Sequence, residues 1–184
     1  GTLDGLARFD GHSFTTYDAA TTPGLVGNRF RAIVQSSNGP LWIATSNGVS
    51  IRRNEHFRRI EGPKHVRSID EGPEGTMWLG GNSGFYRSTD EGVQRIFLPD
   101  SLSDQWIWDV ESVAPDSVWI VTANETLLLY HDGAFASSSK IPPSTSTHRV
   151  AADADSPLWV ATSSAVLSVQ NSTSTRYPYD GVGS

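Results

Sequence analysis

Residues 41–48 read Leu-Trp-Ile-Ala-Thr-Ser-Asn-Gly, and this phrase returns three times in altered form. The other copies are Met-Trp-Leu-Gly-Gly-Asn-Ser-Gly at 77–84, Val-Trp-Ile-Val-Thr-Ala-Asn-Glu at 118–125 and Leu-Trp-Val-Ala-Thr-Ser-Ser-Ala at 158–165. Their tryptophans, Trp42, Trp78, Trp119 and Trp159, are 36, 41 and 40 residues apart. A regular period of about 40 residues indicates a solenoid or a propeller.

The residues between these phrases favour strands. Each unit holds short stretches rich in Val, Ile, Trp, Thr and Tyr, separated by turn signals such as Ser-Asn-Gly, Pro-Glu-Gly and Asp-Gly. Amphipathic patterns of helical period are absent. In the second unit we expect strands near 66–70, 77–80, 85–88 and 94–97. Four antiparallel strands in about 40 residues make one blade of a β-propeller.

The repeats therefore predict an all-β chain, a β-propeller of four full four-stranded blades plus an N-terminal half-blade. The half-blade covers 1–25 and holds only third and fourth strands, because residues 1–6 align with 44–49. The full blades cover 26–64, 65–101, 102–144 and 145–184. We expect a fragment of a larger ring, closed by further blades or by a second copy. The four repeated tryptophans are predicted to fill the spaces between blades.

Composition excludes several classes of function. The 184 residues include no Cys, so thiolate metal sites, disulfides and cysteine nucleophiles are excluded. The formal net charge of -6 argues against binding to nucleic acid or to anionic membranes. No apolar run is longer than four residues, so we expect no transmembrane segment. The five His show no metal-ligand spacing, and no metal or other cofactor is expected.

One repeat resembles a known family. The stretch Asn-x-Phe-x-x-Ile at 28–33, followed by Asn-Gly-x-Leu-Trp-Ile-Ala-Thr-x-x-Gly-Val at 38–49, resembles the two-component regulator propeller repeat. The third copy departs from it, with Glu125 in place of Gly. The resemblance implies a periplasmic or extracellular sensor array that detects carbohydrate breakdown products for a histidine kinase. It implies no catalytic residues, and no kinase part is present in this chain.

Candidate ligand-binding residues emerge when the units are aligned on their tryptophans. Thirteen residues before them stand Arg29, His65, Trp106 and Ser146, and eleven before them stand Arg31, Arg67, Trp108 and His148. Residues two apart on a strand project to the same side, so we expect a partial ring at the channel mouth. Arg binds carboxylate or sulfate and Trp stacks on sugar rings, which suits an acidic oligosaccharide. The alternative is that these are ordinary residues of an exposed rim.

A second set flanks the same face, in the loops between the second and third strands. It comprises Asn47, Asn82, Asn124 and Ser163. Asn and Ser are common turn formers, so this set is interpreted mainly as structural.

The preferred function is a non-catalytic, ligand-sensing propeller, with a protein-interaction scaffold as the alternative. A lyase or glycosidase is a third possibility, since Asp70, Asp109, Glu111 and Asp153 fall on or near first strands, but in differing registers. Residues 88–92, Ser-Thr-Asp-Glu-Gly, are similar to the Asp-box turn of sialidase-like propellers, where Asp90 would accept local backbone N–H groups. No arginine cluster or tyrosine nucleophile with a partner acid accompanies it.

Overall fold

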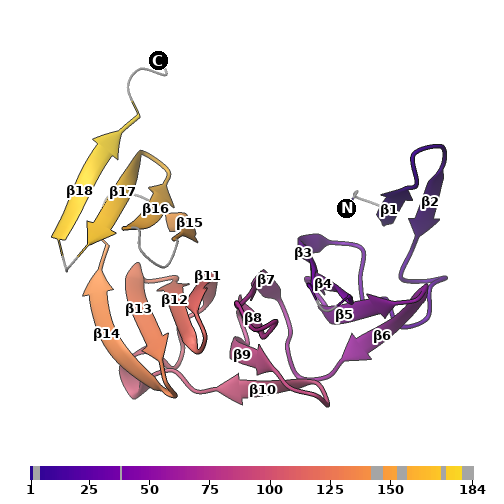
Figure 1. Cartoon of the computed structure of the whole chain (residues 1–184), viewed down its shortest axis with the longest axis horizontal. Coiled ribbons are helices and arrows are strands. Elements are labelled where there is room, and N and C mark those ends of the chain that lie inside the picture. Colours follow the sequence, from indigo (N-terminus) through magenta and orange to yellow (C-terminus); the bar gives the residue numbers. More distant parts are fainter. Residues whose placement is uncertain (2–4, 38, 142–146, 153–156, 171–172, 180–184) are drawn as a thin grey trace.

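The computed structural model describes residues 1, 5–37, 39–141, 147–152, 157–170 and 173–179. They form four four-stranded antiparallel sheets and one two-stranded sheet, arranged side by side along an open arc (Figure 1). The two-stranded sheet and the last four-stranded sheet lie on either side of the opening. The predicted β-propeller with four blades and a half-blade is confirmed, and the ring is open within the described residues.

The half-blade consists of β1 (Leu6–Phe9) and β2 (Phe14–Tyr17). The first blade contains β3 (Phe30–Gln35), β4 (Leu41–Thr45), β5 (Gly48–Arg53) and β6 (His56–Ile60). The second contains β7 (Val66–Glu71), β8 (Met77–Gly81), β9 (Gly84–Ser88) and β10 (Val93–Ile96). The third contains β11 (Ile107–Ala114), β12 (Ser117–Thr122), β13 (Thr126–His131) and β14 (Ala134–Lys140). The fourth contains β15 (Thr147–Ala151), β16 (Leu158–Thr162), β17 (Ala165–Gln170) and β18 (Thr173–Pro178).

These sheets lie inside the predicted blade ranges, whose limits stay a prediction. A short 3-10 helix, η1 (Asp100–Leu102), precedes the third blade. None of the helices in the described parts is long and apolar enough to cross a membrane.

Every four-stranded sheet is a meander whose innermost strand comes first. Strands β3, β7, β11 and β15 contact one another in that order and line the concave side of the arc, as Figure 1 shows. Because the strands are antiparallel, the loops that lead into the innermost strands share a face with the turns between second and third strands. We call this the mouth face. The remaining turns, between first and second and between third and fourth strands, form the far face.

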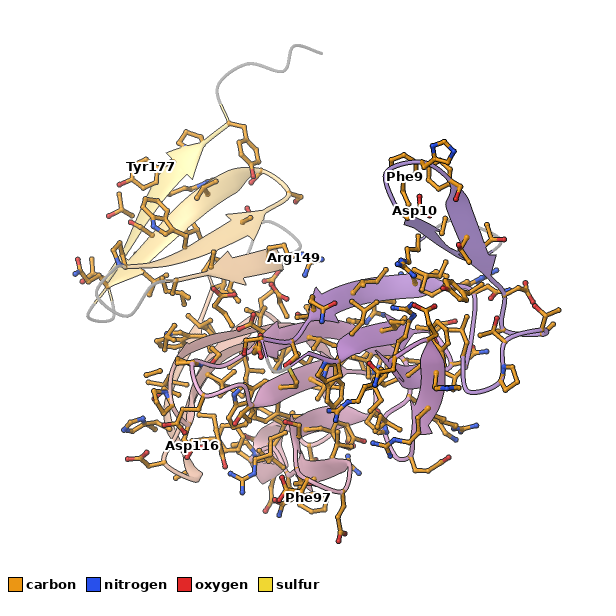
Figure 2. The ribbon with its side chains drawn as sticks, turned by 45° about the vertical axis from the view of Figure 1, so that its right-hand side comes forward. Phe9, Asp10, Phe97, Asp116, Arg149 and Tyr177 are labelled. Atoms are coloured by element: carbon orange, nitrogen blue, oxygen red, sulfur yellow. The ribbon has the colours of Figure 1, made fainter. Side chains whose placement is uncertain are left out.

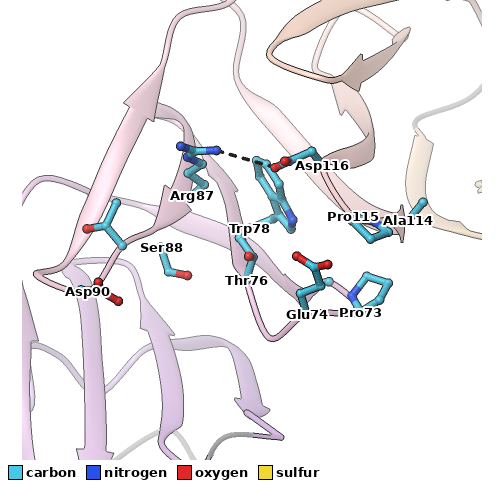
Figure 3. A pocket seen from close by; sticks show the side chains of 12 residues that line it. Pro73, Glu74, Thr76, Trp78, Arg87, Ser88, Asp90, Ala114, Pro115 and Asp116 are labelled. Atoms are coloured by element: carbon cyan, nitrogen blue, oxygen red, sulfur yellow. Dashed lines mark ion pairs between the residues drawn. The ribbon is translucent and has the colours of Figure 1, made fainter.

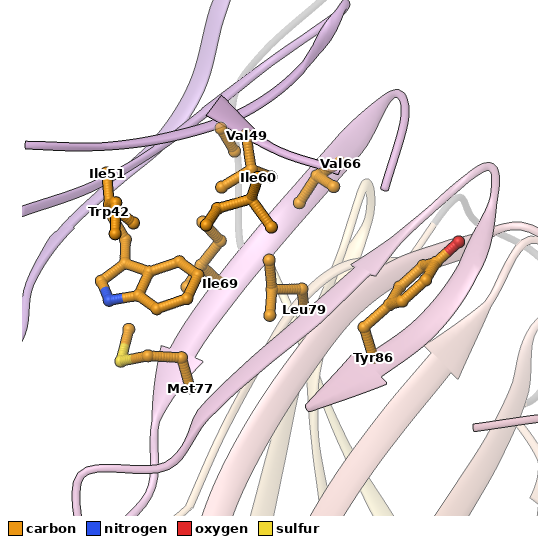
Figure 4. Packing of buried hydrophobic residues seen from close by; sticks show 10 residues of the cluster. Trp42, Val49, Ile51, Ile60, Val66, Ile69, Met77, Leu79 and Tyr86 are labelled. Atoms are coloured by element: carbon orange, nitrogen blue, oxygen red, sulfur yellow. The ribbon is translucent and has the colours of Figure 1, made fainter. Parts of the chain in front are cut away.

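Successive side chains of the repeated phrase point to opposite faces of the strand. In β8, Met77 and Leu79 point back to the first blade and belong to one buried cluster with Trp42 (Figure 4). Trp78 points the other way and packs against the third blade, in a cluster that includes Val110. Trp42, Trp78 and Trp119 each fill the space toward the next blade in this way.

The burial of the four tryptophans follows from whether a next blade is present. Trp78 is only 1% exposed, Trp42 is also buried, and Trp119 is half-buried against the fourth blade. Trp159 differs from the expectation of a buried core residue, since it is 39% exposed and contacts only Tyr177 among the described aromatic rings, at 5.8 Å. No described blade follows the fourth one, so its outer face stays open.

The threonine of the phrase stabilises the turn into the third strand. The hydroxyl groups of Thr45 and Thr162 donate to backbone carbonyls of the following strand at 3.1 and 2.8 Å, and the hydroxyl of Thr122 accepts the backbone N–H of Thr126 at 3.2 Å. In the divergent third copy, Glu125 occupies the left-handed region with φ +62°, which a glycine adopts at no steric cost. The hydroxyl bridge therefore persists where the glycine does not.

Carboxylates bind the innermost strands of neighbouring blades to one another. Asp70 Oδ2 accepts the backbone N–H of Ser112 at 2.7 Å, and Asp109 Oδ2 accepts that of Val150 at 2.8 Å. Glu111 Oε1 likewise accepts the N–H of Ala152 at 3.2 Å. These three carboxylates, considered above as acid/base candidates, link blades together, and Asp153 lies outside the described residues.

Burial governs the ionisation of Asp70. Desolvation raises the pKa of its carboxyl group, and the nearby charge of Asp109 adds to this. Backbone N–H groups of Ser112 and Glu71 act in the opposite direction. The net result is a raised pKa, so the folded protein holds the Asp70 proton more strongly than the unfolded chain does.

The half-blade is attached to the outer part of the first blade. Leu6 packs with Leu25 and Ile43, while Glu55 accepts hydrogen bonds from Arg8 and Tyr17 at 2.9 and 3.0 Å. A hollow of about 230 Å³, lined largely by apolar groups, lies beside it. The lining residues are Gly1, Leu6, Ala7, Arg8, Tyr17, Ile33, Leu41 and Arg52.

Substituting the repeated tryptophans separates packed from open blade faces. Trp78→Ala should lower the free energy of unfolding by about 3–5 kcal/mol, because it leaves a large void between two blades. Trp159→Ala should cost about 1 kcal/mol or less, because that side chain is partly exposed. Urea unfolding followed by circular dichroism measures both. Equal losses would contradict the open outer face of the fourth blade.

The Asp70 bridge gives a prediction that depends on pH. Asp70→Ala should lower the free energy of unfolding by about 1–3 kcal/mol, because the half-buried backbone N–H of Ser112 loses its acceptor. Asp70→Asn keeps an acceptor and removes the charge. Since the native pKa is raised, the wild-type protein loses stability as pH rises from the unfolded pKa of Asp70 through its native pKa, whereas Asp70→Asn does not.

The stability of Asp70→Asn relative to wild type should therefore increase as the pH rises above the unfolded pKa of Asp70, which is about 3.9. Unfolding in urea at a series of pH values measures this difference. A difference that falls with pH would show that the native pKa is lowered instead.

Candidate ligand-binding site

The side chain of Arg67 is the centre of a cluster on the mouth face. Its guanidinium carbon lies 4.2 Å from the ring centroid of Trp108 and 5.6 Å from that of Trp106. Its Nε donates to Oδ1 of Asn82 at 2.9 Å. Arg67 comes from β7 and Asn82 from the β8–β9 turn, whereas both tryptophans lie at the start of the third blade. Two neighbouring blades thus hold this guanidinium in one orientation.

The cluster carries positive charge without a local counter-ion. Burial and the charge of Arg31 both lower the pKa of Arg67, so two guanidinium groups lie near each other. Among the described residues, none of the ion pairs includes Arg29, Arg31 or Arg67. Arg31 is exposed and Trp106 is 46% exposed, so the cluster is open to solvent. It can accept an anionic group from outside.

The structure brings together four residues of the predicted ring, namely Arg31, Arg67, Trp106 and Trp108. Arg29 and His65 are exposed on the same loops, and within the described chain neither side chain has a hydrogen bond or ion pair to this group. The side chain of His148 and all of Ser146 lie outside the described residues. The binding role of the whole set stays a prediction.

Only one residue of the second predicted set joins the cluster. Asn82 binds Arg67, whereas Asn124 accepts hydrogen bonds from the hydroxyls of Thr122 and Thr126 at 2.6 and 2.8 Å. The amide oxygen of Asn47 contacts the neighbouring Ser46 hydroxyl, and Ser163 is exposed. The repeat spacing placed all four on the mouth face, but the arginine partner could not be read from it.

Sequence reasoning missed a hollow of about 350 Å³ on the far face, between the second and third blades (Figure 3). The sequence feature nearest this hollow is the Asp-box-like phrase at 88–92. The prediction that Asp90 accepts local backbone N–H groups there is wrong. The turn is closed by Thr89, whose N–H donates to the Gly92 carbonyl and whose hydroxyl accepts the Gly92 N–H at 3.2 Å. Asp90 instead lines the hollow.

Comparison with known proteins agrees with this fold. The first structure is the extracellular domain of the putative one component system BT4673 from B. thetaiotaomicron, with a TM-score of 0.76 and 19% identity over 98% of this chain. The second is the extracellular domain of the putative hybrid two component system BT3049 from the same organism, with a TM-score of 0.62 and 19% identity over 81% of this chain. The chain spans 29% and 21% of their lengths. A third, YCF48 bound to D1 peptide, has a TM-score of 0.61 and 14% identity over 99% of this chain and 60% of its own.

At the level of sequence, no curated protein matches the chain. The profile of the two-component regulator propeller family matches residues 24–47, from the loop before β3 to the β4–β5 turn. This confirms the resemblance noted for the first repeat. The chain is a β-propeller arc that carries a two-component regulator propeller repeat.

Proposed function

We propose that the chain is the non-catalytic, ligand-binding part of a two-component regulator sensor outside the cytoplasm, and that it recognises acidic carbohydrate at its mouth face. The repeat at 24–47 supports the sensor role, as do the extracellular domains that share the fold. One observation carries the ligand class. Arg67 lies on the face of Trp108, is held by Asn82, and has no carboxylate partner within the described chain.

The chemistry of the cluster favours a carboxylate or sulfate. Two guanidinium groups near each other repel, and an anion between Arg31 and Arg67 relieves that repulsion. Arg binds such groups through two parallel N–H donors, provided the guanidinium is held in a suitable orientation. The indole of Trp106 remains 46% exposed and offers an apolar face for a sugar ring.

The proposal assigns no catalysis to this chain. Asp70, Asp109 and Glu111 accept backbone N–H groups of the neighbouring blade, which supports a structural role for them rather than an acid/base role. The cluster spans the second and third blades, so a bound ligand would favour one relative position of those blades. Kinase activity would then reside elsewhere in the longer protein.

A protein-interaction scaffold is the second candidate, and the exposed indole of Trp106 favours it. Exposed aromatic residues beside arginine are typical of interaction surfaces. The solved structure of YCF48, which shares the fold at 14% identity, is bound to a peptide. A scaffold would bind no acidic sugar, and its affinity for a protein partner would depend on Trp106.

A pair of matched double variants tests the carbohydrate proposal. Arg31→Ala with Arg67→Ala should weaken binding of trigalacturonate about 100-fold, because two charged hydrogen-bond donors are lost. Arg58→Ala with Arg59→Ala removes the same charge from exposed positions on β6 and should leave the affinity unchanged. Isothermal titration calorimetry measures both affinities, with neutral maltotriose as the control ligand.

Equal affinity of the wild type and the Arg31 and Arg67 double variant for trigalacturonate would refute the proposed mouth-face site. Absence of binding by any uronate or sulfated sugar, together with capture of a protein that depends on Trp106, would favour the scaffold.

A further inference from the structure

The hollow on the far face is formed by turns of two neighbouring blades. Its walls are the β7–β8 turn with Glu74, the β9–β10 turn with Asp90, and the β11–β12 turn with Asp116. A second hollow, of about 380 Å³, lies between the first and second blades and shares Glu74, Thr76, Ser88, Thr89 and Asp90 with it. The two hollows therefore adjoin at the turns of the second blade.

The indole N–H of Trp78 opens into the first hollow (Figure 3). Trp78 is 1% exposed, and none of the described residues accepts a hydrogen bond from its Nε1. Gly72 keeps this donor accessible, because a Cβ atom at that position would lie 3.2 Å from Nε1 and 2.9 Å from Oγ of Ser112. Because this N–H faces the hollow, its acceptor comes from solvent or from a ligand.

The walls of the hollow carry unpaired negative charge. Asp116 pairs across the blades with Arg87 at 3.6 Å. Glu74 and Asp90 belong to none of the ion pairs between described residues. The hollow therefore offers two carboxylates that are free to bind a cation.

The hydroxyl groups beside these carboxylates are held in place. Ser88 Oγ accepts the N–H of Met77 at 2.9 Å, and Thr89 Oγ1 accepts that of Gly92 at 3.2 Å. Each hydroxyl hydrogen remains available as a donor. The hollow thus combines fixed neutral donors with anionic acceptors.

We propose that this hollow binds a small hydroxylated organic cation of the amino-sugar class. Its ammonium group would bind the carboxylate of Glu74, and its ring hydroxyls would donate to Asp90, accept from the indole N–H of Trp78 and bind Ser88 (Figure 3). A metal ion fits less well, since no group of three or more His, Asp or Glu side chains among the described residues could hold one. The site lies on the face opposite Arg67 and does not depend on the proposed function.

The ligand class is tested by titrating the protein with glucosamine and, separately, with glucose, using isothermal titration calorimetry. Glucosamine should bind saturably, and glucose at least about tenfold more weakly, because glucose lacks the ammonium group that pairs with the carboxylate of Glu74. Absence of saturable glucosamine binding would overturn the proposal. Equal affinity for both sugars would also overturn it.

Matched variants locate the site. Glu74→Gln with Asp90→Asn should weaken glucosamine binding at least about tenfold. Glu61→Gln with Glu91→Gln, which removes the same charge from exposed residues that do not line the hollow, should leave it unchanged. Equal weakening by both double variants would show that only the overall charge matters, and would refute the site.

Two single variants complete the test. Gly72→Ala keeps every charge and covers the indole N–H of Trp78, so it should also weaken glucosamine binding. Because a Cβ at this position is tightly placed, its urea unfolding midpoint is measured alongside. Arg67→Ala should leave glucosamine affinity unchanged, and a loss there would place the ligand on the mouth face instead.

Discussion

Packing between neighbouring blades is the constraint on which the rest of the structure depends. Each inner sheet is covered on both faces, so no blade can bury its apolar residues alone. The second strand of a blade meets this need in both directions, as Met77 and Leu79 pack against the first blade and Trp78 against the third. The tryptophan is the largest of these groups, and its burial removes a large apolar area from water.

The innermost strands add a polar component to this packing. Asp70, Asp109 and Glu111 bind backbone N–H groups of the next blade, close to the channel. Such hydrogen bonds form only when the neighbouring strand has one position along the strand direction and one orientation. They therefore align the loops of the mouth face, where Arg67 of the second blade meets Trp108 of the third. The candidate site depends on this alignment because its residues come from different blades.

The two faces of the arc differ in electrostatic character. The mouth face presents Arg31 and Arg67 beside indole rings, whereas the far-face hollow presents Glu74 and Asp90. An acidic protein with a net charge of -6 can hold both because the sheets separate the faces. The proposed ligands of the two faces accordingly carry opposite charges.

The sequence by itself determined the strands, their grouping into four blades and a half, and the role of the repeated tryptophan. The contacts behind these features recur every two residues along a strand and about every forty residues along the chain. Such periods can be recognised in the amino-acid sequence alone. The strands expected at 66–70 and 77–80 are found at Val66–Glu71 and Met77–Gly81. The gathering of Arg31, Arg67, Trp106 and Trp108 was also within reach, because aligned positions of successive blades are neighbours.

Only the tertiary structure decided what happens where repeats stop or differ. Trp159 is exposed because no described blade packs against it. The repeated phrase around Trp159 does not distinguish it from the buried tryptophans. The choice of Asn82 as partner of Arg67, and the opening of Trp78 onto a hollow beside Gly72, depend on side chains of three separate turns and strands. Such contacts are set by the distance between blades, and no local pattern in the sequence specifies that distance.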